Sequence, residues 1–141
     1  MRARLFALIV GLLASLFGAG LMLAREPDDH QEVSTQKLIE QALAGEAGKE
    51  VVAQTYEFLP GMVLPWHIHP DAHEIAYVIE GTLTFEREGA APVEIKAGGA
   101  DYLPPNVVHR GINNTDKPVK LFVVRIKPKE KPLVEEVAPP R

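Results

Sequence analysis

The feature that most constrains the fold is a series of short β-type runs between residues 50 and 127. Glycine, proline and asparagine interrupt these runs, and no segment between them has the length and apolar periodicity of an amphipathic helix. Many short strands at near-regular spacing predict an all-β fold, and we expect an antiparallel jelly-roll β-barrel. The predicted strands are residues 51–59, 63–68, 74–80, 82–88, 93–96, 101–103 and 119–126.

The run Ile75-Ala76-Tyr77-Val78-Ile79 is apolar at every position. Successive side chains of a strand point to opposite faces, so both faces of this strand are apolar. One face is expected to fill the barrel, and the other needs a cover from another sheet or another subunit. A homodimer is the simplest cover.

The N-terminus differs in composition from the rest of the chain. Arg2 and Arg4 precede residues 5–24, which carry no charge and only one polar side chain, Ser15. Residues 1–24 are therefore predicted to be a signal peptide or a helical membrane anchor, and neither the length nor the candidate cleavage sites decide between the two. In both cases the flanking arginines place the remaining chain in the periplasm or outside the cell, secreted or anchored to the cytoplasmic membrane.

Residues 25–36 are rich in acidic and polar side chains and are predicted to be a linker. The folded domain is expected at residues 37–127. Its first segment, residues 38–43, fits a short helix or a strand equally well, and the strands that follow favour a strand. Residues 128–141 combine four prolines with alternating charges, which predicts a tail of loop or disorder.

Charge and cysteine content narrow the classes of function. The 15 basic and 19 acidic residues include no basic run with interleaved aromatic residues, so we expect no nucleic-acid surface. The expected partners are a small molecule and a second copy of the chain, with membrane contact only through the N-terminal segment. The chain has no cysteine, which leaves histidine and carboxylate as the strong metal-ligand types.

Three histidines and one glutamate occur at spacings that allow a β-barrel to direct all four at one ion. His67 and His69 are two residues apart and share a face of a strand, and Glu74 follows after a short turn. His109 begins another strand after the corner Pro104-Pro105-Asn106. This ligand set suits one divalent ion, whether Mn, Fe, Co, Ni, Cu or Zn.

The two stretches that carry these residues resemble the two sequence motifs of the cupins. The first reads Gly61-x5-His67-x-His69-x4-Glu74-x6-Gly81, and the second reads Gly98-x5-Pro104-x-Asn106-x2-His109-x3-Asn113. The resemblance covers residues 50–127 and implies a small conserved barrel of the single-domain type with a central metal. Asn106 stands where the second motif usually has glycine; because asparagine tolerates the left-handed conformation, we expect the turn to survive.

The resemblance leaves the reaction open, because cupins include enzymes, binding modules and storage proteins. We expect a metal-dependent oxidoreductase of the dioxygenase or oxidase type, with Fe or Mn favoured and Glu74 as both ligand and proton acceptor. The alternative is a non-catalytic module that binds or senses a small ligand. Tyr102 and Arg110, which flank the second motif, are the candidate substrate contacts. Trp66 is expected to pack away from the metal, and His73 to be a solvated loop residue.

Overall fold

A computed structural model describes residues 33–141. The described chain consists of strands and loops, and no helix in it is long and apolar enough to cross a membrane. The predicted signal peptide or anchor and most of the predicted linker lie outside the described residues. The strands are β1 (Ser34–Ala42), β2 (Lys49–Phe58), β3 (His67–Ile68), β4 (His73–Glu80), β5 (Thr82–Arg87), β6 (Val93–Lys96), β7 (Ala100–Leu103), β8 (His109–Ile112), β9 (Val119–Pro128) and β10 (Glu135–Glu136).

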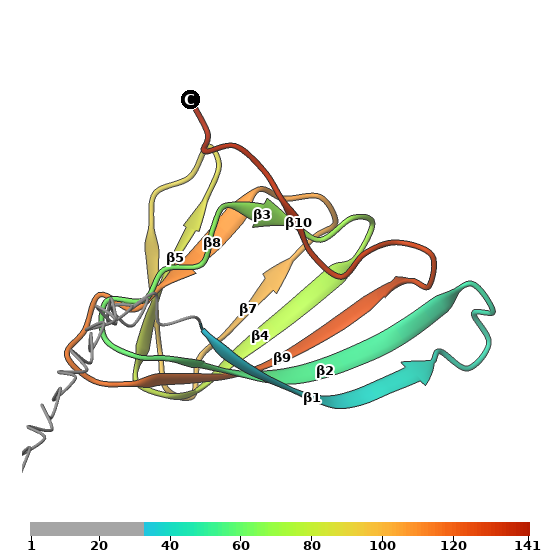
Figure 1. Ribbon diagram of the computed structural model, residues 1–141, viewed down its shortest axis with the longest axis horizontal. Helices are drawn as coiled ribbons and strands as arrows, with labels where there is room; N and C mark the ends of the chain where they lie inside the picture. Colours follow the sequence, from blue (N-terminus) through green and yellow to red (C-terminus); the bar gives the residue numbers. More distant parts are fainter. Residues whose placement is uncertain (1–32) are drawn as a thin grey trace, which may run out of the picture.

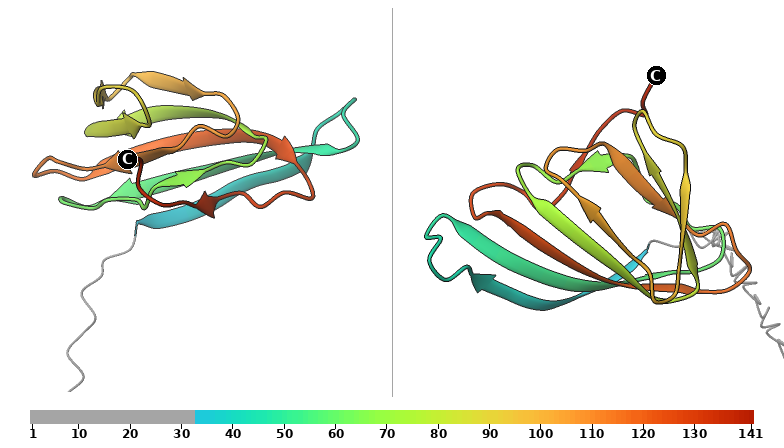
Figure 2. Two further views of the ribbon diagram at one scale, coloured as in Figure 1. Left: turned by 90° about the horizontal axis from the view of Figure 1, so that it is seen from above. Right: turned by 180° about the vertical axis from the view of Figure 1, so that it is seen from behind.

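The strands form two five-stranded antiparallel sheets that face each other (Figure 1). The first sheet has the order β1-β2-β9-β4-β7, and the second has the order β10-β3-β8-β5-β6. The sheets converge at one end and splay apart at the other, and the β1–β2 hairpin projects beyond the second sheet (Figures 1 and 2). The prediction of an all-β fold of antiparallel sheets is confirmed.

Most predicted strands lie within two residues of their observed bounds. The segment 38–43, for which the sequence allowed a helix, lies in strand β1 up to Ala42, and β1 pairs with β2. The predicted strand 63–68 is shorter: only His67 and Ile68 form β3, and Val63 makes an isolated bridge to Ile112. This departure is local, because Pro65 has no backbone N–H to donate to a ladder.

The C-terminal tail is loop, as predicted, except for the short strand β10, which the sequence analysis did not anticipate. After β9 the chain turns back across the open end between the sheets, and β10 pairs with β3 (Figure 1). This pairing could not be predicted from the sequence, because a two-residue strand is held by backbone hydrogen bonds and needs no apolar periodicity.

The hydrophobic core lies between the two sheets. Alternate side chains of β2, β4, β5 and β9 point inward, and the largest fully buried apolar side chains are Phe58, Val78, Leu83, Leu103, Val119 and Val123. Burying a side chain of this size stabilises the fold by about 1.5–3 kcal/mol. The core fills the narrow end of the barrel, which leaves the polar inward-facing residues near the open end.

The backbone conformation at two turns explains which residues occupy them. Gly81 has a φ of +81°, and a Cβ at this position would lie 2.6 Å from the carbonyl oxygen of Pro118. Asn106 has a φ of +63°, which confirms that it adopts the conformation expected of the usual glycine. Its side chain also exchanges two 3.0 Å hydrogen bonds with Asp71, which has a φ of +54°. Asn106 therefore ties together two loops beside the site.

The outer face of the first sheet is apolar and uncovered among the described residues. Ile75, Tyr77 and Ile79 of β4 are 51%, 42% and 45% exposed, whereas the alternate residues Ala76 and Val78 are buried. The expectation that one face of this strand fills the barrel is confirmed. The cover expected over the other face, from another sheet or another subunit, remains a prediction.

Candidate metal centre

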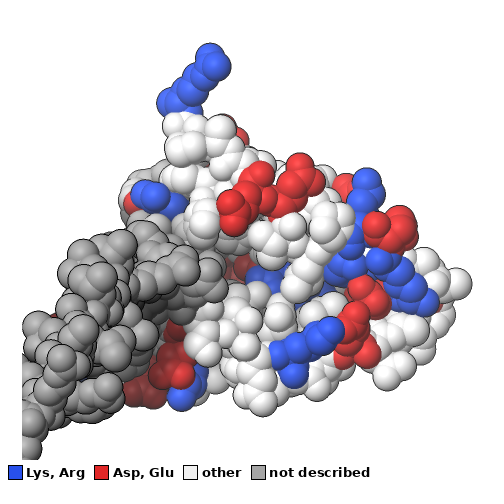
Figure 3. All heavy atoms as spheres, viewed as in Figure 1, with Lys and Arg blue, Asp and Glu red and all other residues white. Residues whose placement is uncertain are grey.

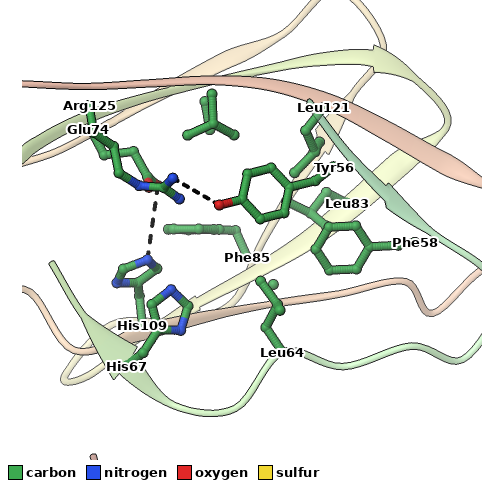
Figure 4. Close-up of a pocket in the computed structure, with 13 residues that line it drawn as sticks. Tyr56, Phe58, Leu64, His67, Glu74, Leu83, Phe85, His109, Leu121 and Arg125 are labelled. Carbon is green, nitrogen blue, oxygen red and sulfur yellow. Dashed lines mark hydrogen bonds and ion pairs between the residues drawn. The ribbon is translucent and has the colours of Figure 1, made fainter. Parts of the chain in front are cut away.

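The four predicted ligands come from both sides of the barrel and meet in its interior, where Figure 4 shows three of them, His67, His109 and Glu74. His67 of β3 and His109 of β8 are register partners on adjacent strands of the second sheet. His69 follows β3 by one residue, and Glu74 projects from β4 of the first sheet. All four side chains are at most 5% exposed.

The histidines form a compact cluster. One ring nitrogen from each of His67, His69 and His109 lies within 4.8 Å of the others, which is close enough for a single ion. Glu74 adjoins this cluster: its Oε2 lies 2.8 Å from His69 Nε2, and its Oε1 lies 3.9 Å from His109 Nε2. The structure thus brings together the three histidines as a candidate metal site, with the glutamate at its edge.

Each histidine is held in the tautomer that a metal requires. The Nδ1–H of His67 donates to the Pro65 carbonyl at 2.7 Å, that of His69 to the Leu133 carbonyl at 2.6 Å, and that of His109 to the Val107 carbonyl at 2.8 Å. A carbonyl oxygen only accepts, so Nδ1 carries the proton and Nε2 of each neutral ring carries a lone pair. Outer hydrogen bonds of this kind orient and tune metal-binding histidines.

Burial favours the neutral form of His67 and His109. It lowers the pKa of His67, and burial together with the neighbouring His67 lowers the pKa of His109 to about 4. Nε2 of His67 and Nε2 of His109 accept no hydrogen bond from the described residues, and their convergence with Nε2 of His69 fits a divalent first-row ion. The donor set does not choose among Fe, Mn, Ni, Co, Cu and Zn.

A buried arginine that the sequence analysis missed completes the centre. Arg125 of β9 is directly opposite Glu74 in the first sheet, and its Nε donates to Glu74 Oε2 at 2.6 Å and to His69 Nε2 at 3.2 Å. Burial alone would raise the pKa of Glu74, but the charge of Arg125 outweighs this effect and the pKa is lowered to about 2. Glu74 is therefore ionised, with Oε2 held by the arginine.

The other end of the arginine is anchored in β2. Its Nη1 donates to Gln54 Oε1 at 3.0 Å and to the Tyr56 hydroxyl at 2.9 Å, and that hydroxyl donates to Gln54 Oε1. Its Nη2 donates to none of the described residues, although Arg125 is only 4% exposed and borders both cavities of the site. This nitrogen is a free donor at the candidate centre.

Two small cavities adjoin the cluster. One, of about 30 Å³, lies inside the barrel among apolar side chains such as Phe58, Leu83 and Phe85 (Figure 4). The other, of about 110 Å³, lies toward the open end, where Val134 and Glu136 of the C-terminal segment form part of its wall. A cavity of about 150 Å³ holds benzene, so the larger space admits a molecule of only a few non-hydrogen atoms.

The two predicted substrate contacts lie away from this site. Tyr102 is 51% exposed, and its hydroxyl lies 2.7 Å from Nδ1 of His73, whose ring stacks on it. Arg110 stacks on the Trp66 ring at 4.6 Å and donates to Glu86 at 2.6 Å. Trp66 packs as expected. Neither predicted contact borders the two cavities beside the histidines.

Figure 3 shows the charged side chains on one face of the molecule. Acidic and basic side chains are interspersed on this face.

Comparisons with known proteins agree with this architecture. The family model described as "Cupin domain" matches residues 54–125. No curated protein matches the sequence. Among solved structures, a protein with a double-stranded β-helix domain from Klebsiella pneumoniae is 21% identical with a TM-score of 0.61, over 78% of this chain and 88% of that one.

Two enzymes are also among the similar structures. DMSP lyase DddQ from Ruegeria pomeroyi is 22% identical with a TM-score of 0.61, over 79% of this chain and 55% of the lyase. An oxalate oxidase in complex with the substrate analogue glycolate is 22% identical with a TM-score of 0.58, over 86% of this chain and 63% of the oxidase. At these identities the likeness concerns the fold.

Proposed function

Because the chain belongs to the cupin family, we propose that it is a metal-dependent oxidoreductase of the dioxygenase or oxidase type that acts on a small organic molecule. The observation that carries this proposal is the convergence of three buried histidine Nε2 lone pairs beside an ionised glutamate. His67, His69, His109 and Glu74 would hold one divalent ion, with Fe or Mn favoured. When bound, such an ion supplies Lewis-acid and redox chemistry at the cavities.

Glu74 serves this site mainly as a fixed negative charge. Arg125 holds its Oε2, whereas its Oε1 accepts no hydrogen bond within the described residues and faces the histidines. A carboxylate whose pKa is about 2 is a weak proton acceptor at neutral pH. The arrangement therefore favours the ligand role, and the catalytic role of Glu74 remains a prediction.

Charge balance favours an anionic substrate. Glu74 and Arg125 neutralise each other in a buried environment, so a divalent ion would add two uncompensated positive charges. Arg125 borders the cavity, and its Nη2, which donates to none of the described residues, offers a hydrogen bond to a carboxylate or a similar group. The oxalate oxidase among the similar structures holds glycolate, a molecule of suitable size for the cavity of about 110 Å³.

A second candidate is binding without turnover, as in a sensing module. The low pKa of Glu74 favours it: the smaller cavity has no other carboxylate on its wall, and the larger cavity has only the exposed Glu136. Oxygen consumption distinguishes the two functions. The purified protein would be loaded with Fe²⁺ or Mn²⁺ and supplied with acetate, glycolate or oxalate.

The proposal expects oxygen uptake that requires the metal and disappears in a His67→Ala variant. A Trp66→Phe variant is a suitable control, because this neighbouring side chain packs outside the site. Tight binding of an acid that is recovered unchanged would support the binding module instead. Absence of both binding and turnover across the panel would contradict the proposed ligand class.

Location and assembly are further parts of the proposal. The arginines and apolar run of residues 1–24 support an extracytoplasmic position, anchored or secreted. The exposed apolar side chains of Ile75, Tyr77 and Ile79 support a homodimer through the first sheet. Light scattering should give twice the mass of the chain, and an Ile75→Lys variant should give the monomer.

A further inference from the structure

The C-terminal segment of residues 129–137, here called the strap, reaches the metal centre directly. The Leu133 carbonyl accepts the Nδ1–H of His69 at 2.6 Å, a contact between residues 64 positions apart. Next along the strap, Glu135 pairs with Ile68 and Glu136 with His67. The strap thus contacts two of the three clustered histidines.

His69 depends on the strap in a way that the other histidines do not. His67 and His109 each donate to the carbonyl two residues earlier, so their own local backbone orients them. The partner of His69 comes from the far end of the chain, and its position therefore depends on tertiary structure. If the strap leaves, His69 loses the acceptor that fixes its tautomer and ring orientation.

The strap also forms part of the cavity wall. Val134 and Glu136 border the cavity of about 110 Å³ together with His67 and Arg125. In Figure 1 the strap crosses the open end between the two sheets. It therefore limits the size of a molecule that reaches the histidines from this side.

The strap is held mainly by hydrogen bonds rather than by buried apolar surface. Its backbone is fixed at both ends, because Lys129 N–H donates to the Gly48 carbonyl and Val137 N–H donates to the Trp66 carbonyl, each at 2.9 Å. Within the strap only Leu133 and Val137 are half-buried, and the other side chains are exposed. Segments with little apolar burial open at low free-energy cost, so a bound ion can shift this equilibrium.

We propose that the strap is a positioning element for His69 and that its docking is coupled to metal binding. This inference rests on the proposed metal site. Docking pre-orients His69, which raises metal affinity, and by reciprocity the bound metal stabilises the docked strap by the same factor. Loss of an outer hydrogen-bond partner of a metal ligand lowers affinity about 10–100-fold.

Truncation tests the coupling on the chain itself. A protein that ends at Pro128 lacks the strap, and a control that ends at Val137 lacks only residues 138–141. Calorimetric titration with Mn²⁺ or Zn²⁺ should show an affinity about 10–100-fold weaker for the first protein and unchanged for the control. Equal affinities in the two proteins would overturn the inference.

Two further measurements separate positioning from a general effect on folding. Val137→Pro removes the N–H that bonds to Trp66, whereas Val137→Ala keeps it, so only the proline variant should bind metal more weakly. Hydrogen exchange of residues 129–137 in the full chain should slow when metal is added, and unchanged exchange would contradict the coupling. If the full chain takes up no metal at all, the proposed function itself fails.

Discussion

Removing the guanidinium of Arg125 should be among the most destabilising single changes in this protein. The Arg125→Met variant leaves the carboxylate of Glu74 buried and without its charged partner, whose Nε lies 2.6 Å away. Both side chains are at most 5% exposed, so solvent does not screen the loss. Breaking a buried ion pair by removing one partner costs about 3–5 kcal/mol.

The pKa of Glu74 leads to a similar magnitude. Its decrease from 4.5 to about 2 is a net effect, in which the charge of Arg125 outweighs the opposing effect of burial, and it corresponds to about 3 kcal/mol at 1.36 kcal/mol per pKa unit. Urea denaturation of the metal-free protein at pH 7 should therefore show a free energy of unfolding lower by about 3 kcal/mol or more. Arg110→Met is the matched control: this arginine is 30% exposed and paired with Glu86, so its loss should cost at most about 1 kcal/mol.

A double-mutant cycle isolates the pair. Adding Glu74→Gln to Arg125→Met removes the buried unpaired charge, so the double variant should be more stable than the sum of the two single effects predicts. The coupling should amount to several kcal/mol, since both groups lie in the same dry environment. Additive effects, or equal costs for Arg125→Met and Arg110→Met, would refute the assignment of Arg125 as the counter-charge of the centre.

Three further predictions concern single positions. The metal-free protein should lose stability as the pH falls from 6.5 to 4, because His109 has a pKa of about 4 when folded and binds its proton more readily when unfolded. Urea midpoints measured across this range should depend less on pH in the His109→Gln variant. Gly81→Ala should destabilise more than Gly61→Ala by thermal denaturation, since both have a φ of +81° but only at Gly81 would the new methyl contact Pro118. Asn106→Gly should keep the turn but lose the hydrogen bonds across the loop, lowering the unfolding free energy by about 1 kcal/mol, whereas an unchanged value would show that those bonds contribute nothing.

The ligands could be predicted from the sequence because their geometry depends on local periodicity. Two histidines that are two residues apart share a face, and His109 opens a strand at a position set by the preceding corner. The sequence predicted Glu74 beside them, and the structure places it across the barrel interior at hydrogen-bonding distance from His69. The spacing within each motif is local, whereas bringing Glu74 and His109 to the two neighbouring histidines depends on the barrel that the resemblance to the cupins implied.

The inward, buried position of Arg125 also follows from strand periodicity, although the sequence analysis did not single out this residue. Along β9 the residues Leu121, Val123, Arg125 and Lys127 alternate on the inward face and are all buried. A charge in such a series requires a buried partner, and here Glu74 and Glu50 provide the partners for the arginine and the lysine. The same alternation turns Arg110 away from His109, its neighbour on β8.

The strap could not be predicted in this way. Its composition lacks apolar alternation, and its contacts with the second sheet are made by backbone groups that every residue except proline carries in full. The carbonyl that accepts the hydrogen bond of His69 is determined by the direction in which the chain leaves β9, which is a property of the tertiary structure. The sequence of residues 129–137 therefore resembles that of a loop or disordered tail, although the segment includes the strand β10.

Metal stoichiometry is the most direct test of the central claim that three oriented histidines form a binding site for one ion. The protein purified without an affinity tag should bind one equivalent of a divalent first-row ion, and both His67→Ala and His109→Ala should lose it. Asn114→Ala, a change at an exposed residue bonded to Thr84 outside the centre, should retain it. Failure of the unmodified protein to bind any such ion, or stoichiometric retention by either histidine variant, would contradict the account.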